Sequence, residues 1–233
     1  MKTLLAAMIL TLGAAPAWPQ TLPSVDLVYA TVGATNLNLR LYRPLVCPGP
    51  WPVVIFFHGG GWSSGSHESL SDTLIEALNR GLAVASVEYR LTSEASKFHP
   101  ESVTFPAQIH DAKAAVRCLR ARADELGLDS ARFASAGVSA GGHLAVLLAV
   151  TGGTKELEGR LGPHLGVSSA VQACVDFFGP VDLLNLSRDA AAIAHPAVDH
   201  DAPGAPASRL LGWGEPGQGL GDMRALEFDS VAR

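Results

Sequence analysis

Apolar and polar residues alternate along the chain in short blocks that predict strands and helices in turn. Residues 25–30 and 37–42 are typical of a β-hairpin, since Leu37, Leu39 and Leu41 fall on one face of the second strand. Further strands are predicted at 53–57, which is continuously apolar, and at 82–87, 132–136 and 171–178. Apolar residues spaced by three or four positions predict helices at 70–78, 106–119 and 144–150.

This alternation of strand and helix predicts an α/β fold, with a doubly wound, mostly parallel sheet and helices on both of its faces. Beyond Pro180 the pattern loosens into loops rich in proline and glycine, with short helical pieces expected at 208–211 and 223–231. There is no internal repeat and no sign of a second domain. Residues 18–233 are therefore expected to form a single domain.

The composition limits the classes of partner. Hydrophobic residues make up 48% of the 233 positions and charged residues 17%, which excludes disordered and fibrous classes. The formal net charge of −5 is mild, and the absence of a Lys/Arg run excludes nucleic acid and an anionic membrane surface as expected partners. A small, roughly neutral molecule is the expected ligand, and the oligomeric state stays open.

The first residues predict an export signal. Lys2 precedes an apolar stretch at 4–12, and Ala15-Pro16-Ala17 fits the A-x-A cleavage pattern. A membrane anchor needs roughly 20 apolar residues, and Gly13, Pro16 and Pro19 interrupt this stretch too early. A buried first helix is the other alternative. We expect residues 1–17 to be a signal peptide cut after Ala17, with no membrane anchor, so that the mature protein is secreted or periplasmic.

Three cysteines, Cys47, Cys118 and Cys174, are an odd number, so at least one thiol stays unpaired in a monomer. Cys118 falls on an apolar helical face and Cys174 within an apolar strand, where free cysteines are often small buried hydrophobic residues. We expect both to be buried and no disulfide to be essential.

The pattern G-x-S-x-G occurs twice, around Ser139 and around Ser63. A nucleophile elbow needs a strand before it and a helix directly after it, so that a sharp turn lifts the serine hydroxyl above the sheet. Only Ser139 has both flanks, because Ser63 leads into a polar segment. The alternative reading of Ser139 is a residue that merely caps its helix. We interpret Ser139 as a catalytic nucleophile.

A second glycine-rich segment, His58-Gly59-Gly60-Gly61-Trp62, follows the strand at 53–57. Consecutive glycines let backbone N–H groups point inward, where they could stabilise an oxyanion together with the amide of Ala140. The predicted oxyanion hole is therefore Gly60, Gly61 and Ala140. Trp62 is expected to line the pocket mouth and bind substrate, and His58 to be a structural hydrogen bonder of its loop. A merely flexible turn is the alternative.

These motifs resemble the α/β-hydrolase superfamily in its HGGG-type branch, related to hormone-sensitive lipase and bacterial carboxylesterases, near secreted feruloyl and acetylxylan esterases. The resemblance covers about residues 37–211 and rests on five motifs: His58-Gly59-Gly60-Gly61-Trp62, Glu88-Tyr89-Arg90-Leu91, Phe105-Pro106-Ala107-Gln108 with Asp111, Gly137-Val138-Ser139-Ala140-Gly141-Gly142-His143-Leu144, and Phe178-Gly179-Pro180-Val181-Asp182-Leu183. It implies an α/β-hydrolase fold, ester hydrolysis without cofactor or metal, and scaffold roles for Tyr89, Arg90 and Asp111.

The resemblance also implies a triad acid and a histidine after the last two strands, and the sequence departs from the family here. No apolar strand follows Phe178, so the last strands are expected to be missing and the domain to be incomplete at its C-terminus. Other acids and bases are Asp182, Asp199, Asp201, Asp222, His143, His164, His195 and His200. None completes the triad convincingly, and the His195–Asp201 set is expected to be solvated loop rather than a metal site.

The sequence therefore predicts a secreted serine hydrolase that cleaves carboxylic esters with a short acyl, aryl or carbohydrate-linked group, through an acyl-enzyme on Ser139. If the triad is unfinished, this 233-residue form should be nearly inactive. A serine exopeptidase of the same fold is one alternative. A catalytically inactive, hydrolase-like binding protein or fragment is the other.

Overall fold

The structure, a computed structural model, describes residues 22–68, 70–98, 103–193 and 199–212. The predicted signal peptide and the predicted helix at 223–231 lie outside these residues. Six strands form one sheet in the order β1-β2-β4-β3-β5-β6. Their bounds are β1 (Ser24–Val32), β2 (Thr35–Tyr42), β3 (Trp51–Phe57), β4 (Ala83–Val87), β5 (Leu128–Val138) and β6 (Ala173–Phe177).

The sheet has the predicted character. β1 and β2 form the antiparallel hairpin, and β2 pairs antiparallel with β4. The neighbours β4, β3, β5 and β6 are all parallel. Parallel strands need crossover connections, which the intervening helices supply. The mostly parallel α/β sheet expected from the alternating pattern is confirmed.

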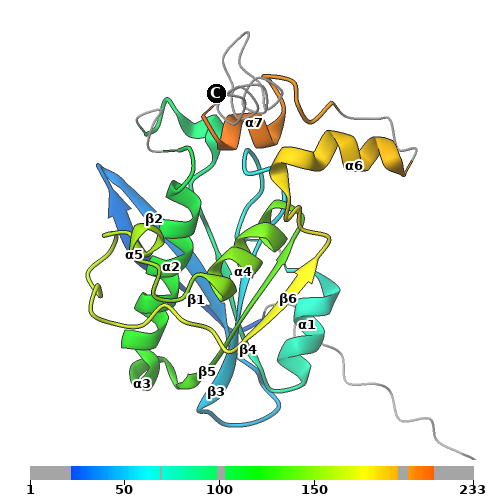
Figure 1. Cartoon of the computed structure of the whole chain (residues 1–233). Helices are drawn as coiled ribbons and strands as arrows, with labels where there is room; N and C mark the ends of the chain where they lie inside the picture. The colour runs from blue at the N-terminus through cyan, green and yellow to red at the C-terminus, as the bar shows by residue number, and fades with distance from the viewer. Residues whose placement is uncertain (1–21, 69, 99–102, 194–198, 213–233) are drawn as a thin grey trace, which may run out of the picture.

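Helices cover both faces of the sheet (Figure 1). On one face α2 (Ala107–Ala121) and α4 (Ala140–Val150) pack over Ile55 and Phe57 of β3. On the other face α1 (Asp72–Asn79) packs over Phe56, because successive strand residues point to opposite sides. The remaining helices are short: η1 (Thr92–Glu94), α3 (Ala123–Leu126), α5 (Lys155–Glu158), η3 (Leu183–Asn185), α6 (Leu186–Ala192) and α7 (Pro206–Leu210).

A buried ion pair fixes α2 beneath the carboxyl end of β4. The Arg90 guanidinium donates to both carboxylate oxygens of Asp111, the shortest bond being 2.7 Å, and the Arg90 backbone N–H donates to the same carboxylate. Beside it, the Tyr89 hydroxyl donates to the backbone oxygen of His58 at 2.8 Å. Tyr89, Arg90 and Asp111 therefore brace the loops above the sheet, as the scaffold interpretation expected.

β6 is the edge of the sheet, and its surface corrects one prediction. All five of its residues are exposed, including Cys174, which was expected to be buried. An apolar strand pattern predicts burial only where neighbours cover the strand, and among the described strands β6 pairs with β5 alone. Cys118 in α2 is buried as expected, and all three cysteines are free thiols. Within the described ranges, no helix combines the length and apolar character needed to cross a membrane.

Candidate active site

Sheet register brings the two glycine-rich segments together. Phe57 of β3 lies opposite Gly137 of β5, so the loops that leave these parallel strands start side by side at one edge of the sheet. The first loop begins with His58 and the second contains Ser139, 81 residues apart in the sequence. This carboxyl edge is where open α/β sheets place their ligand sites.

Ser139 occupies a sharp turn between β5 and α4. Its backbone is left-handed, with φ 54° and ψ −119°, which is uncommon for a residue with a side chain. The Ser139 N–H donates to the carbonyl of Phe177 at the end of β6, and its own carbonyl accepts from His143 N–H in the first turn of α4. The turn is therefore held from both sides, and the serine stays half-buried at the top of the sheet.

The two glycines of the Ser139 motif are required by the close approach of backbone segments. A side chain at Gly137 would overlap the backbone of Gly141, and one at Gly141 would overlap the carbonyl oxygen of Phe57. Both close approaches occur because the strand, the turn and the helix meet within five residues. The strand-turn-helix context predicted for Ser139 is confirmed.

The triglycine segment borders the Ser139 turn directly. A Cβ placed on Gly59 would lie 3.5 Å from the Ser139 Cβ. Gly60, Gly61 and Trp62 continue with positive φ angles of 117°, 60° and 55°. These left-handed residues turn the backbone sharply above the nucleophile.

The side chains of His58 and Ser63 stabilise the loop that contains the triglycine segment. The His58 ring stacks on Tyr89, its Nδ1 lies 2.7 Å from the Gly59 oxygen, and burial lowers its pKa. The Ser63 hydroxyl donates to the Gly60 carbonyl, inside the turn that follows the triglycine segment. Both observations fit the structural interpretation of these residues and set the second G-x-S-x-G pattern apart from the elbow.

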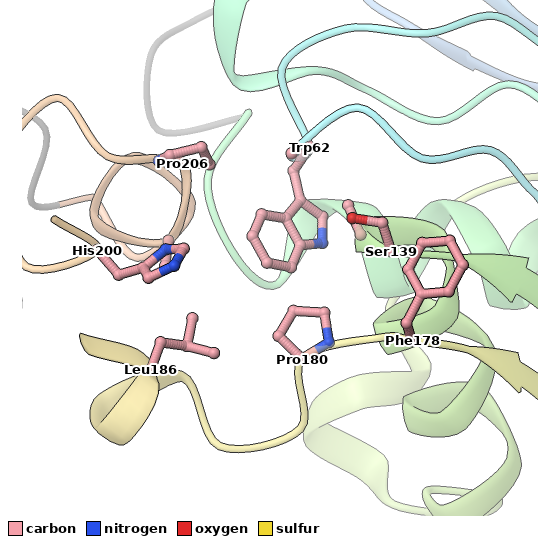
Figure 2. Close-up of a pocket in the computed structure, with 10 residues that line it drawn as sticks. Trp62, Ser139, Phe178, Pro180, Leu186, His200 and Pro206 are labelled. Atoms are coloured by element: carbon pink, nitrogen blue, oxygen red, sulfur yellow. The ribbon is translucent and has the colours of Figure 1, made fainter. Parts of the chain in front are cut away.

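A cavity of about 260 Å³ opens beside Ser139 (Figure 2). Four of its lining residues come from the two predicted motifs: Gly61, Trp62, Ser139 and Ala140. The others are Phe178, Pro180, Leu186, His200, Pro206 and Ala207. The cavity thus collects most predicted site residues. Gly60 does not line it, and Trp62 is buried in its wall rather than standing at an open mouth.

The second wall of the cavity was not predicted. Phe178 and Pro180 follow β6, and the Phe178-Gly179-Pro180 motif after a strand was the one signal that could have marked them. Leu186 begins α6, and Pro206 and Ala207 begin α7. Both helices lie beyond the carboxyl ends of the parallel strands (Figure 1). Their sequence offers no signal for such a role.

The described candidates for acid and base are scattered. His143 lies in α4 with its ring edge-on to Trp62, and burial lowers its pKa to about 4. His164 lies in the loop after α5, while Asp182 accepts a hydrogen bond from Asn185 in η3 and Asp199 accepts one from the Asp201 backbone N–H. His200 lines the cavity, but no hydrogen bond joins it to Ser139 in the described structure. His195 and Asp222 lie outside the described residues. Among the residues described, no cluster of metal-ligating side chains occurs.

Comparison with known proteins places this geometry in a family. The BD-FAE family model matches residues 39–216. Carboxylesterase NlhH of Mycobacterium tuberculosis is 39% identical over 137 residues, covering 56% of this chain and 40% of the relative. The chain therefore spans about two fifths of the length of that curated relative.

Solved structures of esterases are also similar to this chain. A truncated carbohydrate esterase from gut microbiota has a TM-score of 0.68 at 30% identity, covering 84% of this chain and 68% of that one. Thermophilic esterase Est2 of Thermogutta terrifontis, solved with propionate bound, has a TM-score of 0.58 at 30% identity, covering 67% of this chain and 54% of that one. The chain belongs to the BD-FAE family and has the α/β-hydrolase fold of these esterases.

Proposed function

We propose that this protein is a serine hydrolase that cleaves carboxylic esters through an acyl-enzyme on Ser139. The observation that carries the proposal is the left-handed serine at the strand-helix turn, which borders one cavity with Gly61 and Ala140. Strained backbone of this kind is concentrated at functional sites. The esterase names of the relatives give independent support for ester chemistry.

In the proposed reaction the Ser139 hydroxyl oxygen attacks the ester carbonyl carbon and gives its proton to a histidine. The backbone N–H groups of Gly60, Gly61 and Ala140 stabilise the negative charge that forms on the carbonyl oxygen. Collapse of this intermediate expels the alcohol, which takes the proton from the histidine. Water then repeats the sequence on the acyl-enzyme and releases the carboxylic acid.

The histidine in this proposal lies outside the described residues, because no described imidazole bonds the Ser139 hydroxyl. His200 is the described alternative, since it lines the same cavity. A His200→Ala variant separates the two possibilities. Esterase activity within twofold of the unmutated protein is expected, whereas loss by a factor of 100 or more would make His200 the base.

The proposed substrate is an ester with a small acyl group. A cavity of about 260 Å³ is at the low end of the size of ligand pockets and favours small groups. The propionate complex of the Thermogutta esterase supports a short acyl chain, and the carbohydrate esterase relative supports a sugar-linked alcohol.

Covalent labelling tests the nucleophile. We expect a fluorophosphonate probe to label the protein and p-nitrophenyl acetate to be hydrolysed above background, with Ser139→Ala abolishing both. Ser63→Ala is the matched control, because Ser63 carries the second G-x-S-x-G pattern, and it should retain both signals. Labelling that survives Ser139→Ala, or ester hydrolysis that is equal in Ser139→Ala and in the unmutated protein, would refute the proposal.

Export through an N-terminal signal belongs to the same proposal. The Lys2 start, the apolar stretch and the Ala15-Pro16-Ala17 site support it. Mass spectrometry of protein expressed in a Gram-negative host should find a periplasmic species that begins at Trp18. A cytoplasmic species that keeps Met1 would contradict it.

A further inference from the structure

The indole N–H of Trp62 lies in the cavity wall without a hydrogen-bond partner. Trp62 is only 3% exposed, and its Nε1 is a buried donor that no described residue accepts from. Tryptophan N–H groups usually find a partner when buried. A buried donor left unpaired costs about 1–3 kcal/mol. The position therefore needs an explanation other than packing.

The surrounding contacts hold this ring in place. The Trp62 backbone is left-handed at φ 55°, and its carbonyl accepts a 2.8 Å hydrogen bond from Thr92 N–H. The His143 ring meets the indole edge-on, with the ring centroids 5.3 Å apart. Strained backbone of this kind persists only where surrounding structure determines it. The orientation of the indole is thus built into the fold.

The indole is also turned toward the reacting group. Figure 2 shows its nitrogen edge facing the side of the cavity where Ser139 and Phe178 lie. The neighbouring cavity walls are largely apolar, with Phe178, Pro180 and Leu186 among them. These side chains offer no acceptor for the N–H, and no other described residue accepts from it, so the N–H is available to a ligand in the cavity.

We propose that the Trp62 N–H donates a hydrogen bond to a second oxygen of the substrate, distinct from the carbonyl oxygen that is attacked. This inference rests on the proposed ester hydrolysis and sets its specificity. The site then prefers esters with an ether or hydroxyl oxygen near the ester group, as in polyhydroxylated alcohols or alkoxy acids, over hydrocarbon esters of equal size. A site built to pair a polar group rejects the analogue that lacks it.

Isosteric substrate pairs test this preference. p-Nitrophenyl methoxyacetate and butyrate differ by one oxygen in the acyl group, and 2-methoxyethyl acetate and butyl acetate differ likewise in the alcohol. In one of the two pairs, Trp62→Phe should lower the kcat/KM ratio of oxygen ester to hydrocarbon ester about 5- to 10-fold relative to the unmutated protein. That pair identifies the half of the substrate that carries the oxygen. If Trp62→Phe lowers kcat/KM by the same factor for the oxygen ester and the hydrocarbon ester in both pairs, the inference is overturned.

A binding measurement separates this inference from the proposed catalysis. In the Ser139→Ala variant, where no turnover occurs, a ¹H–¹⁵N spectrum reports each indole N–H, and Trp62→Phe assigns the Trp62 signal. We expect 2-methoxyethyl acetate or methyl methoxyacetate to move this proton downfield, and butyl acetate and methyl butyrate not to. Trp51 is the internal control, because its indole N–H already donates to Cys47 O at 2.9 Å.

The two failures are distinguishable. Equal shifts from the oxygen and hydrocarbon esters, or no shift from either, would overturn the role of Trp62 even if Ser139 hydrolyses esters. A selective shift without Ser139-dependent hydrolysis would uphold the Trp62 donor and refute the reaction. If Trp62→Phe fails to fold, single changes to Phe at the other three tryptophans, Trp18, Trp51 and Trp213, assign the Trp62 signal by elimination, so the test does not depend on that variant.

Discussion

At the residue scale, the site depends on backbone atoms that come unusually close together. Gly137 and Gly141, on either side of the left-handed Ser139, are positions where an added Cβ would overlap neighbouring backbone. The same closeness brings the Phe57 carbonyl against the first turn of α4. Steric demands on single residues thus determine where the serine hydroxyl is held.

Gly141→Ala should therefore destabilise the fold strongly. The new methyl group would overlap the Phe57 carbonyl oxygen, and backbone atoms there cannot move aside as a flexible side chain can. We expect a loss of about 3 kcal/mol or more in the free energy of unfolding, measured in urea, or no soluble protein. Gly166→Ala is the matched control, because nothing lies within 4 Å of its added Cβ. A Gly141→Ala protein as stable as the control would show that the crossing is looser than described.

His143 should make stability depend on pH. Burial lowers its pKa from the ordinary 6.5 to about 4, so between these values the unfolded chain binds a proton that the folded protein does not. The free energy of unfolding should therefore fall as the pH drops from 6.5 to 4, by on the order of 2 kcal/mol from this residue. Urea titrations at several pH values measure the slope.

His143→Gln should flatten that decline, whereas His164→Gln, in the loop after α5, should keep it. An unchanged slope in His143→Gln would contradict the prediction. Because the imidazole is neutral above pH 5, the variant should not alter the pH profile of ester hydrolysis in that range.

At the scale of elements, buried ion pairs tie α2 to the rest of the domain. Arg90 and Asp111 join it to the end of β4. Further along the helix, Lys113 and Arg117 both pair with the carboxylate of Glu158, the last residue of α5. Each buried charge has an oppositely charged partner, as buried charges require. The helix is therefore tied to the segment that follows β4 and to α5.

Asp111→Ala should cost about 3–5 kcal/mol of stability, because it leaves the buried Arg90 guanidinium without its carboxylate. Glu125→Ala is the control, since it breaks an ion pair with Arg122 at the surface and should change stability little. Thermal and urea unfolding measure both. Equal effects would show that the Arg90 pair is not an anchor.

At the scale of the whole molecule, the β6 edge of the sheet is exposed and apolar. Val175 is 47% exposed and Phe178 just beyond it is 78% exposed. An edge strand that presents free backbone groups and apolar side chains is a template for pairing with another strand.

The 233-residue chain should therefore self-associate through β6. We expect sedimentation velocity to show association that increases with concentration, and Val175→Lys to suppress it. Val28→Lys is a matched control, because Val28 on the opposite edge strand β1 is also 47% exposed. A monomer at all concentrations, or equal suppression by both variants, would contradict this role of β6.

The sequence by itself determined the parts of this protein that depend on local sterics and on periodicity. Alternating residues at 37–42 specified a strand of the hairpin, and the spacing of apolar residues specified α2. Gly137 and Gly141 around Ser139 specified the elbow, because only glycine fits so tight a crossing. Such features involve residues close together in the chain, so their pattern can be read without knowing the fold.

Only the tertiary structure decided which distant segments meet. Leu186 and Pro206 come to the cavity because α6 and α7 lie above the strand ends, and His200 comes from the turn before α7; no local pattern encodes that placement. Cys174 is exposed because β6 is an edge, although its apolar strand predicted burial. The unpaired N–H of Trp62 likewise exists only once the walls around it have packed. Burial and hydrogen bonding depend on residues that folding brings close together. A local sequence pattern contains only one of the two residues in each such contact.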